Sequence, residues 1–266
     1  MSVWNGERYL RTDVESLLAQ TYRDFELLVV NDASTDQTPT ILSQFAQQDP
    51  RIRIITNSIN LGLTKSLNRA LKETQSDFIA RMDADDIALP TRLQKQVAFL
   101  DAHPDVGIVG TAYQFINDAG DLVGEKHPPT QDHALRRALI RFNPFLHSSV
   151  MVRKTLLDRV HGWDETYRRA QDYDLWMRAA PLTKLANLPE VLMQKRFTIG
   201  MISYAKEREQ IRSALRVRLL AIRRKQYRIW SMIFLVKPFL AIILPASVVR
   251  FVRIHLFKQH LYKKPS

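Results

Sequence analysis

The sequence has no cysteine, and this absence removes several kinds of chemistry at once. A chain of 266 residues without cysteine offers no disulfide, thiolate metal site or cysteine nucleophile. The N-terminus also lacks a basic region followed by an apolar stretch and a small-residue cleavage site. The sequence therefore predicts no secretory signal and a catalytic part that stays in the cytoplasm.

Acidic residues are scarce at one end of the chain only. Residues 1 to 204 hold 24 Lys and Arg against 25 Asp and Glu, whereas residues 205 to 266 hold 15 against 2, so the net charge of +12 lies in the tail. A nucleic-acid-binding domain would spread positive charge over its recognition face. The neutral body therefore argues against nucleic acid as a partner, and 45% apolar residues can fill a core.

Helical and strand patterns alternate along the first 110 residues. The pattern predicts strands at 25–30, 52–55, 78–82, 107–111 and 148–153, and helices around Val14 to Leu18, at 38–48, at 63–73, from Pro90 to about 102 and from Asp172. This alternation is typical of an α/β domain with a mostly parallel sheet flanked by helices. Ligands bind at the carboxyl ends of such strands, so we expect Asn31-Asp32 and Asp83 to Asp86 on the same rim.

Three carboxylates within four residues follow the strand predicted at 78–82. Asp83, Asp85 and Asp86 would repel one another without a cation, and carboxylate oxygens suit Mg²⁺ or Mn²⁺, which also bind phosphates. An isolated D-x-D is more often a solvated acidic turn with a helix cap. Here the strand-end context favours a metal on a diphosphate.

A sugar that leaves with a nucleoside diphosphate needs its negative charge neutralised, which a metal can do. One further carboxylate must then deprotonate the incoming hydroxyl. The candidate is Asp172, at the predicted start of a helix. Aspartate also suits a helix cap or first turn, so a capping role for Asp172 or Asp174 remains open and does not exclude catalysis.

Four segments together carry a family resemblance. They are Phe25 to Asp36 (FELLVVNDASTD), Asn60-Leu61-Gly62, Ala80 to Asp86 (ARMDADD) and Gln171 to Trp176 (QDYDLW). In order, spacing and strand context, residues 1 to 200 resemble the family 2 inverting glycosyltransferases with the GT-A fold, of the kind that assembles bacterial polysaccharides or glycolipids. Asn31 and Gln171 stand where Asp and Glu are common in that family. Met1 to Glu7 resembles the end of the family's first strand, so most of that strand is expected to be missing.

The resemblance implies a role for each candidate residue. Asp32 would bind the nucleotide base, Asp83 the ribose or the metal region, Asp85 the Mn²⁺ or Mg²⁺ on the diphosphate, and Asp172 would be the catalytic base. Lys65 and Arg81 would assist the nucleotide or phosphates, with a solvated or structural cation as the alternative for each. His147 and Trp163 would border the acceptor, with core packing as the alternative.

The tail, residues 201 to 266, differs from the catalytic domain at 1–200. Nine basic and two acidic residues lie between Lys206 and Arg228, and an apolar run from Ser231 to Val249 is interrupted by Lys237 and two prolines. Basic residues on both flanks disfavour a single span, because both would prefer the cytoplasmic side. We therefore expect a basic helical appendage that lies on the membrane surface as an interfacial helix or shallow hairpin, with a soluble helical tail as the alternative.

The expected activity is transfer of a sugar from a nucleoside-diphosphate sugar to a lipid-linked or saccharide acceptor. The setting would be surface polysaccharide or glycolipid assembly, with the protein peripheral on the cytoplasmic face of the membrane. A nucleotidyltransferase is one alternative, although such enzymes more often have a Gly-rich, basic phosphate loop near the N-terminus, and none is visible. A non-catalytic, degenerate nucleotide-sugar-binding protein associated with the membrane is the other.

Overall fold

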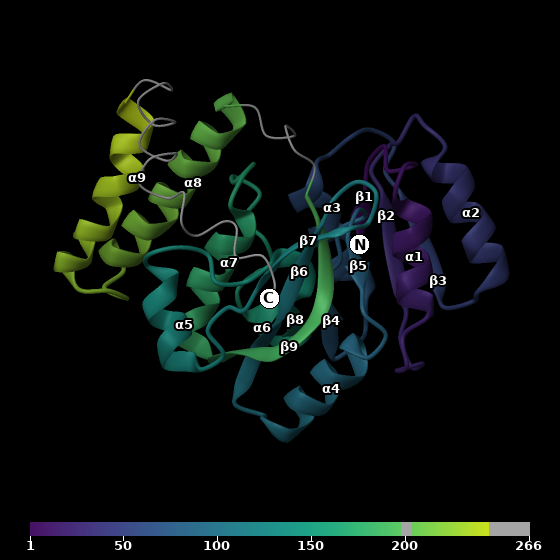
Figure 1. The fold of residues 1–266 in the computed structure, drawn as a ribbon, viewed down its shortest axis with the longest axis horizontal. Coiled ribbons are helices and arrows are strands. Elements are labelled where there is room, and N and C mark those ends of the chain that lie inside the picture. Colours follow the sequence, from purple (N-terminus) through teal and green to yellow (C-terminus); the bar gives the residue numbers. More distant parts are fainter. Residues whose placement is uncertain (198–203, 245–266) are drawn as a thin grey trace.

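The computed structural model describes residues 1–197 and 204–244, which form two sheets flanked by helices (Figure 1). The first sheet has the order β1-β2-β3, and its strands pair in parallel. The second has the order β4-β8-β6-β9-β5, with β7 paired to β6. The strands are β1 (Ser2–Val3), β2 (Leu27–Asn31), β3 (Ile52–Thr56), β4 (Phe78–Ala80), β5 (Ile87–Ala88), β6 (Val106–Ile116), β7 (Leu122–Lys126), β8 (Met151–Arg153) and β9 (Lys184–Arg196).

The helices account for most of the remaining described residues. They are α1 (Leu10–Leu18), α2 (Thr38–Gln48), α3 (Leu63–Glu73), α4 (Arg92–Ala102), α5 (Asp132–Leu139), α6 (Lys154–Arg159), α7 (Gln171–Ala179), α8 (Tyr204–Arg223) and α9 (Ile233–Ile243), with short 3₁₀ helices η1 (His147–Ser149), η2 (Ala180–Leu182) and η3 (Ile229–Met232). The helices predicted at 38–48 and 63–73 are confirmed with the same bounds.

The α/β class is confirmed, but the pairing of strands differs between the two sheets. Parallel pairing holds for β1-β2-β3 and for β6 with β9, whereas β4-β8, β8-β6, β6-β7 and β9-β5 are antiparallel. The expected mostly parallel arrangement therefore describes the first sheet only. The long strand β9 has no clear strand pattern because Pro189 and Glu190 interrupt it: Thr111 pairs with Leu188 and Ala112 with Val191, so two residues bulge out.

Alternate residues of β6 pack on opposite faces of the second sheet. Ile108 lies in the core with Trp176 of α7, whereas Val109 lies with Leu93 of α4. The sheet is therefore covered on both faces. The strands β6 and β9 also approach closely, because a Cβ on Gly110 would lie 2.1 Å from Oδ1 of Asn187.

The two sheets meet at β2 and β4, which are not paired with each other. Strand β1 spans two residues, and the Met1 ammonium donates a hydrogen bond of 2.8 Å to the carbonyl of Leu28. A cavity of about 420 Å³ lies here, lined among others by Leu27 and Leu28 of β2 and Ile79 and Ala80 of β4. The two sheets are thus held together by side chains and loops at this junction.

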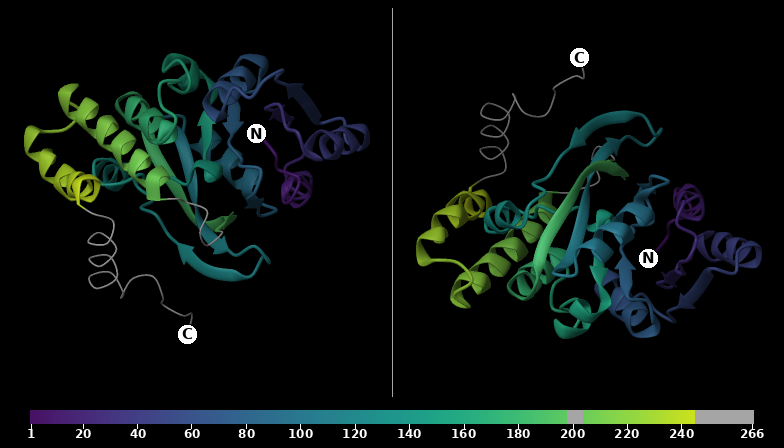
Figure 2. Two further views of the ribbon diagram at one scale, coloured as in Figure 1. Left: turned by 90° about the horizontal axis from the view of Figure 1, so that it is seen from above. Right: turned by 90° about the horizontal axis from the view of Figure 1, so that it is seen from below.

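The C-terminal helices form a hairpin at the end of the molecule opposite the three-stranded sheet (Figure 2). Helix α8 packs on the body, since Val217 and Ala221 belong to the same core as Trp176. Helix α9 packs in turn on α8, where Leu235 meets Leu215. No helix within residues 1–197 and 204–244 is long and apolar enough to cross a membrane. The apolar and basic residues expected from 245 onward lie outside the described residues, and the boundary at residue 200 remains a prediction.

Candidate active site

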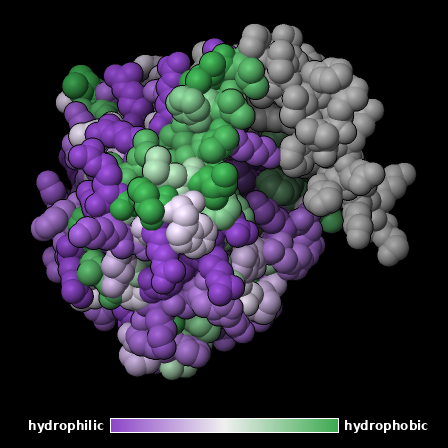
Figure 3. Space-filling model, turned by 90° about the vertical axis from the view of Figure 1, so that its left-hand side faces the viewer, coloured by the Kyte–Doolittle hydropathy of each residue, from purple (hydrophilic) through white to green (hydrophobic). Residues whose placement is uncertain are grey.

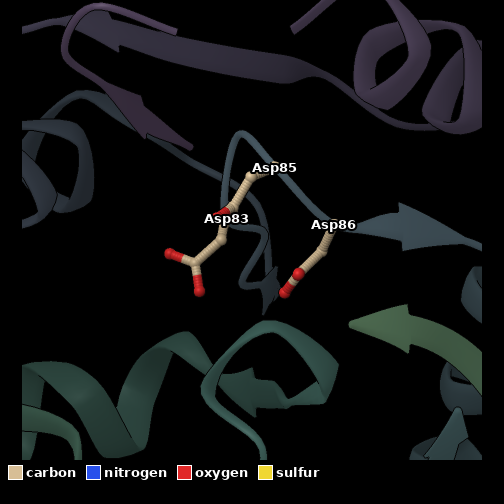
Figure 4. Close-up of side chains that lie close together, drawn as sticks. All are labelled: Asp83, Asp85 and Asp86. Carbon is tan, nitrogen blue, oxygen red and sulfur yellow. The ribbon is translucent and has the colours of Figure 1, made fainter. Parts of the chain in front are cut away.

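The acidic segment predicted to bind a metal forms one turn between β4 and β5 (Figure 4). Asp83, Asp85 and Asp86 each offer a carboxylate oxygen, and these three oxygens lie within 4.8 Å of one another. The turn sits at the carboxyl end of β4, on the rim where β1 and β2 also end. Gly6, in the loop after β1, approaches Ala84 of this turn, since a Cβ on Gly6 would lie 3.9 Å from that of Ala84.

Asp83 is held as a carboxylate by the cations around it. Its Oδ1 accepts a hydrogen bond from Arg81, and its Oδ2 lies 2.7 Å from the hydroxyl of Ser148. Burial alone would raise the pKa of Asp83, but the guanidinium of Arg81 and the ammonium of Lys195 hold it well below its usual range. Asp83 is therefore ionised and partly exposed, which suits a metal ligand.

Asp86 is the structural member of the cluster. It is fully buried, and its Oδ1 accepts a hydrogen bond of 3.0 Å from the backbone N–H of Arg196. Its Oδ2 lies in hydrogen-bonding distance of the Ser148 hydroxyl and 3.8 Å from Nζ of Lys195. Burial raises the pKa of Asp86 to about 6, against the opposing charge of Lys195. Asp86 thus fastens the turn to β9.

Asp85 is the carboxylate best suited to gain a cation. Burial and the neighbouring charge of Asp83 both raise its pKa, so ionised Asp85 is disfavoured in the protein alone. A divalent cation shared by Asp83 and Asp85 would reverse that cost, and two hard carboxylate oxygens match the ligands that Mg²⁺ and Mn²⁺ prefer. The residues present therefore fit such an ion.

Arg81 is neither solvated nor fully paired. It is 3% exposed, and its Nη2 contacts Asp83, but Nε and Nη1 have no hydrogen-bond partner within the described part of the chain. An unsatisfied buried cation is costly, so an anionic ligand beside Asp83 would complete its hydrogen bonds. The solvated alternative for Arg81 is wrong.

Asp172 lies in the first turn of α7. Ala170, two residues before Asp172, has a left-handed φ of 57° and turns the chain into the helix. This conformation costs a non-glycine residue about 1 kcal/mol or more. Asn143 donates a hydrogen bond of 2.7 Å to Oδ2 of Asp172. Burial raises the pKa of Asp172, and the negative charge of Asp83 adds a smaller increase. A carboxylate with a raised pKa suits a general base.

Asp174 has a different environment. It is buried, and its Oδ2 accepts a hydrogen bond of 2.7 Å from Nε of Arg178 in the next turn of α7. Arg178 also donates to the carbonyls of Val160 and Gly162, so this pair ties α7 to the loop after α6. No side-chain cap is formed at Ala170, the N-cap of α7. Asp174 therefore has a structural role.

The carboxylate of Asp32 is engaged by the loop that follows β3. Its Oδ1 accepts hydrogen bonds from Asn57 (2.6 Å) and the backbone N–H of Leu61 (2.8 Å), and its Oδ2 accepts one from the N–H of Gly62 (2.8 Å). This loop leads directly into α3, where Lys65 is exposed. The structure thus brings Arg81, Asp83 and Asp85 together, and the segment 143–148 connects them to Asp172 through Asn143 and Ser148. Asp32 follows β2 and Lys65 lies in α3, and the nucleotide roles of both remain predictions.

His147 and Trp163 lie on the apolar side of the cluster. Their ring centroids are 6.3 Å apart, and Trp163 is 4% exposed within the core that contains Trp176. Burial lowers the pKa of His147 well below its usual value, and the charge of Arg81 acts in the same direction, so the imidazole is neutral. Trp163 packs in the core, as its alternative predicted, whereas His147 lies close enough to Asp83 to sense its charge.

Three residues of the site escape the sequence reasoning. Ser148 bridges Asp83 and Asp86, Asn143 holds Asp172, and Lys195 at the end of β9 faces the acidic turn. Burial lowers the pKa of Lys195, but the charges of Asp86, Asp83 and Asp85 outweigh it and raise the pKa. The sequence does contain the basic pair Lys195-Arg196 after an apolar segment. This pair indicates a contact with the acidic turn only once β9 is known to pair with β5.

Comparison with known proteins gives a consistent result. The sequence model of the family described as "Glycosyl transferase family 2" matches residues 1–160. The chain is 33% identical to EpsE of Bacillus subtilis over 93% of this chain and 89% of that protein. It is 32% identical to AmsE of Erwinia amylovora, named an amylovoran biosynthesis glycosyltransferase, over 85% of each protein.

Two solved structures are similar to this fold. One is S. aureus TarS 1-349 in complex with UDP-GlcNAc, with a TM-score of 0.71 and 20% identity over 98% of this chain and 75% of that one. The other is the mannosyltransferase PcManGT from Pyrobaculum calidifontis in complex with GDP-Man and Mn²⁺, with a TM-score of 0.65 and 18% identity over 98% and 79%. The expected GT-A-like fold is confirmed by these likenesses.

Proposed function

We propose, since the chain belongs to glycosyl transferase family 2, that it transfers a sugar from a nucleoside-diphosphate donor to an acceptor hydroxyl with inversion at the anomeric carbon. The family makes the protein a glycosyltransferase. The finer proposal rests on one observation: Asp83 and Asp85 lie together, and the segment 143–148 contacts Asp172 through Asn143 and Asp83 through Ser148.

Asp83 and Asp85 would hold a divalent cation, Mn²⁺ or Mg²⁺. Such an ion supplies Lewis-acid neutralisation of the leaving diphosphate. The two unpartnered guanidinium nitrogens of Arg81 lie beside Asp83 and would bind the phosphate oxygens. PcManGT, a similar fold, was solved with GDP-Man and Mn²⁺, which supports a nucleotide-sugar donor and a metal here.

Asp172 would accept the proton of the incoming hydroxyl. Its raised pKa makes it a stronger base than an exposed aspartate, and the hydrogen bond from Asn143 to one carboxylate oxygen would hold the group in place. With Asp174 engaged by Arg178, Asp172 is the single base of this helix. One base and one displacement give inversion, because the hydroxyl attacks from the side opposite the leaving group.

The acceptor belongs to a saccharide or lipid-linked saccharide in this proposal. AmsE is named for the biosynthesis of a polysaccharide, amylovoran, and it aligns with most of the present chain. This supports a role in surface polysaccharide or glycolipid assembly.

A donor screen tests the proposal. The Tm of purified full-length protein would be measured with UDP-, GDP-, dTDP- and CMP-sugars, with and without Mn²⁺. The nucleotide sugar that raises Tm most would then be incubated with glycoside acceptors, and the anomeric configuration of the new bond would be compared with that of the donor. We expect Mn²⁺-dependent stabilisation and a product whose anomeric configuration is inverted by NMR. Retention of configuration would refute the single-base mechanism. Conversion of the nucleotide sugar and added pyrophosphate to a nucleoside triphosphate and a sugar 1-phosphate would indicate a nucleotidyltransferase, and binding without donor hydrolysis or transfer would indicate a non-catalytic protein.

A further inference from the structure

The hairpin of α8 and α9 exposes an apolar surface that differs from the rest of the molecule. Exposed large apolar side chains of the body are scattered, whereas η3 and α9 carry eight within fifteen residues. These residues, which we call the apolar face, are Ile229, Trp230, Met232, Ile233, Val236, Phe239, Leu240 and Ile243, with exposed fractions of 46 to 70%. Figure 3 shows apolar surface gathered on this side of the molecule.

Helix α9 is apolar on both of its faces. One face meets α8, where Leu235 is 7% exposed and packs with Leu215 and Ile222. The opposite face carries Ile233, Val236, Leu240 and Ile243, at intervals of three or four residues that align along one stripe. A helix that is apolar all round is normally buried, so the second stripe calls for another apolar environment.

The surroundings of the apolar face are strongly cationic. Arg223, Arg224, Lys225 and Arg228, in the turn between α8 and η3, are exposed, and Lys237 is exposed within α9 itself. After Glu209 the sequence contains no aspartate or glutamate. A partner must therefore be apolar where it meets α9 and anionic around it.

We propose that the apolar face docks on a bilayer that contains anionic lipid. A membrane surface offers both chemistries in the right order, since apolar side chains enter the acyl boundary while Arg and Lys contact the headgroups. Lys237 can extend along the apolar stripe to the headgroup level. Trp230 is an amphipathic side chain of the kind enriched at that interface.

Other occupants fit the charge less well. A second copy docked through the same face would bring two clusters of Arg and Lys together. Residues 245 to 266 of this chain carry five further Lys and Arg and no acidic residue, so folding them over the face would also add like charge. An anionic bilayer relieves this repulsion.

Docking through the hairpin would orient the transferase. The hairpin and the three-stranded sheet with the Asp32 loop lie at opposite ends of the molecule (Figures 1 and 2). A soluble nucleotide sugar would then reach the rim from the aqueous side, whereas an acceptor carried by a lipid would approach from the hairpin side. This orientation goes beyond the proposed transfer reaction and does not depend on it.

Flotation of full-length protein with liposomes tests the proposal without any donor or acceptor. One set of vesicles contains phosphatidylcholine with phosphatidylglycerol and the other phosphatidylcholine alone. We compare the wild type with the apolar variant Ile229→Ser, Trp230→Ser, Ile233→Ser and its matched control Ile59→Ser, Leu122→Ser, Val123→Ser, which removes exposed apolar residues of the body. A charge variant, Arg223→Ser, Arg224→Ser, Arg228→Ser, is matched with Lys72→Ser, Lys126→Ser, Arg159→Ser.

We expect the wild type and both controls to float with the phosphatidylglycerol vesicles and to bind the neutral vesicles much more weakly. The charge variant should lose binding by roughly a hundredfold, and the apolar variant should lose at least as much. All changed side chains are exposed, and circular dichroism would verify folding. Equal binding by the apolar variant and the wild type, or no binding of the wild type, overturns the proposal, and a dimer that only the apolar variant loses would identify the face as a contact between copies.

Discussion

Two acidic segments end neighbouring strands of this protein, and their charges are satisfied in opposite ways. After β2, the buried carboxylate of Asp32 accepts hydrogen bonds from two backbone N–H groups and Asn57. After β4, Asp83 and Asp85 are partly exposed and face the side-chain cations Arg81 and Lys195. The first carboxylate holds a loop in place, whereas the second pair is stabilised by the charges of nearby side chains.

The difference teaches how to separate structural from reactive carboxylates in this fold. Backbone N–H groups satisfy a carboxylate permanently, because they cannot move away without unfolding the loop. Cations on flexible side chains stabilise the charge while leaving lone pairs for a ligand. Asp86 belongs with Asp32, because a backbone N–H of β9 donates to it, whereas Asp83 and Asp85 rely on Arg81 and Lys195. In α7, Asp174 is paired with Arg178 and Asp172 accepts a hydrogen bond from Asn143.

The largest expected effect concerns Asp85, one of the two aspartates stabilised by side-chain charges. Asp85→Ala should abolish transfer and the Mn²⁺-dependent binding of a nucleoside diphosphate, while the fold remains intact, because one metal ligand is lost. Calorimetric titration with the diphosphate of the preferred donor, with and without Mn²⁺, measures this. Asp158→Ala is the control. Because β8 runs antiparallel to β4, the helix α6 that follows β8 begins at the end of the strands opposite to the acidic turn, and Asp158 is exposed there. Unchanged Mn²⁺-dependent binding in Asp85→Ala would refute the metal assignment.

The next effect separates the two aspartates of α7. Asp172→Asn keeps size and hydrogen bonding but cannot take a proton, so turnover should fall by on the order of a hundredfold or more while donor binding survives. Asp174→Asn should lower the free energy of unfolding, because it weakens the contact with Arg178, and leave turnover within a few-fold. Steady-state kinetics and urea unfolding of both variants distinguish them. Near-normal turnover of Asp172→Asn would move the base to another residue.

A third prediction concerns Asp32, the carboxylate held by backbone N–H groups. Asp32→Ala removes the acceptor for the N–H groups of Leu61 and Gly62 and for Asn57, so the free energy of unfolding should fall by about 2 kcal/mol. Amide exchange of residues 57–62 should accelerate. Asp36→Ala removes a more exposed carboxylate of the segment between β2 and α2, which also contains Asp32. This change should lower the free energy of unfolding by less. If Asp32→Ala loses donor affinity with no change in exchange or stability, Asp32 acts on the nucleotide and not on the loop.

The smallest expected effect concerns a buried carboxylate that accepts no hydrogen bond from a backbone N–H or a side-chain cation within the described residues. Asp13 of α1 is 1% exposed, and neither of its oxygens has a hydrogen-bond partner within the described residues. Burial raises the pKa of Asp13 well above its usual value, so the folded state keeps a proton that the unfolded state loses as pH rises above about 4. Asp13→Ala should therefore stabilise the protein by about 1 kcal/mol, with a larger gain at pH 8 than at pH 5. Urea unfolding at both pH values measures this, and an equal or smaller gain at pH 8 would contradict it.

The parts of the fold that are encoded locally could be predicted from the sequence. The helices at 38–48 and 63–73, the turn at Asp83 to Asp86 and the start of α7 each depend on a short run of residues. The second sheet depends on pairings between distant segments, such as β4 with β8 and β5 with β9, which no local pattern reveals. Ser148, Asn143 and Lys195 escaped prediction for the same reason, since their partners lie far away in the chain.

Ser148 connects the charge states of two of the aspartates described above. Its oxygen lies in hydrogen-bonding distance of both Asp83 and Asp86, but a hydroxyl has only one proton to give. Both contacts are satisfied together when Asp86 keeps its own proton and donates it to the Ser148 oxygen, while Ser148 donates to Asp83. With a pKa of about 6, Asp86 changes its proton occupancy close to neutral pH. Ser148 therefore couples the two carboxylates, because the direction in which its hydroxyl donates depends on whether Asp86 is protonated.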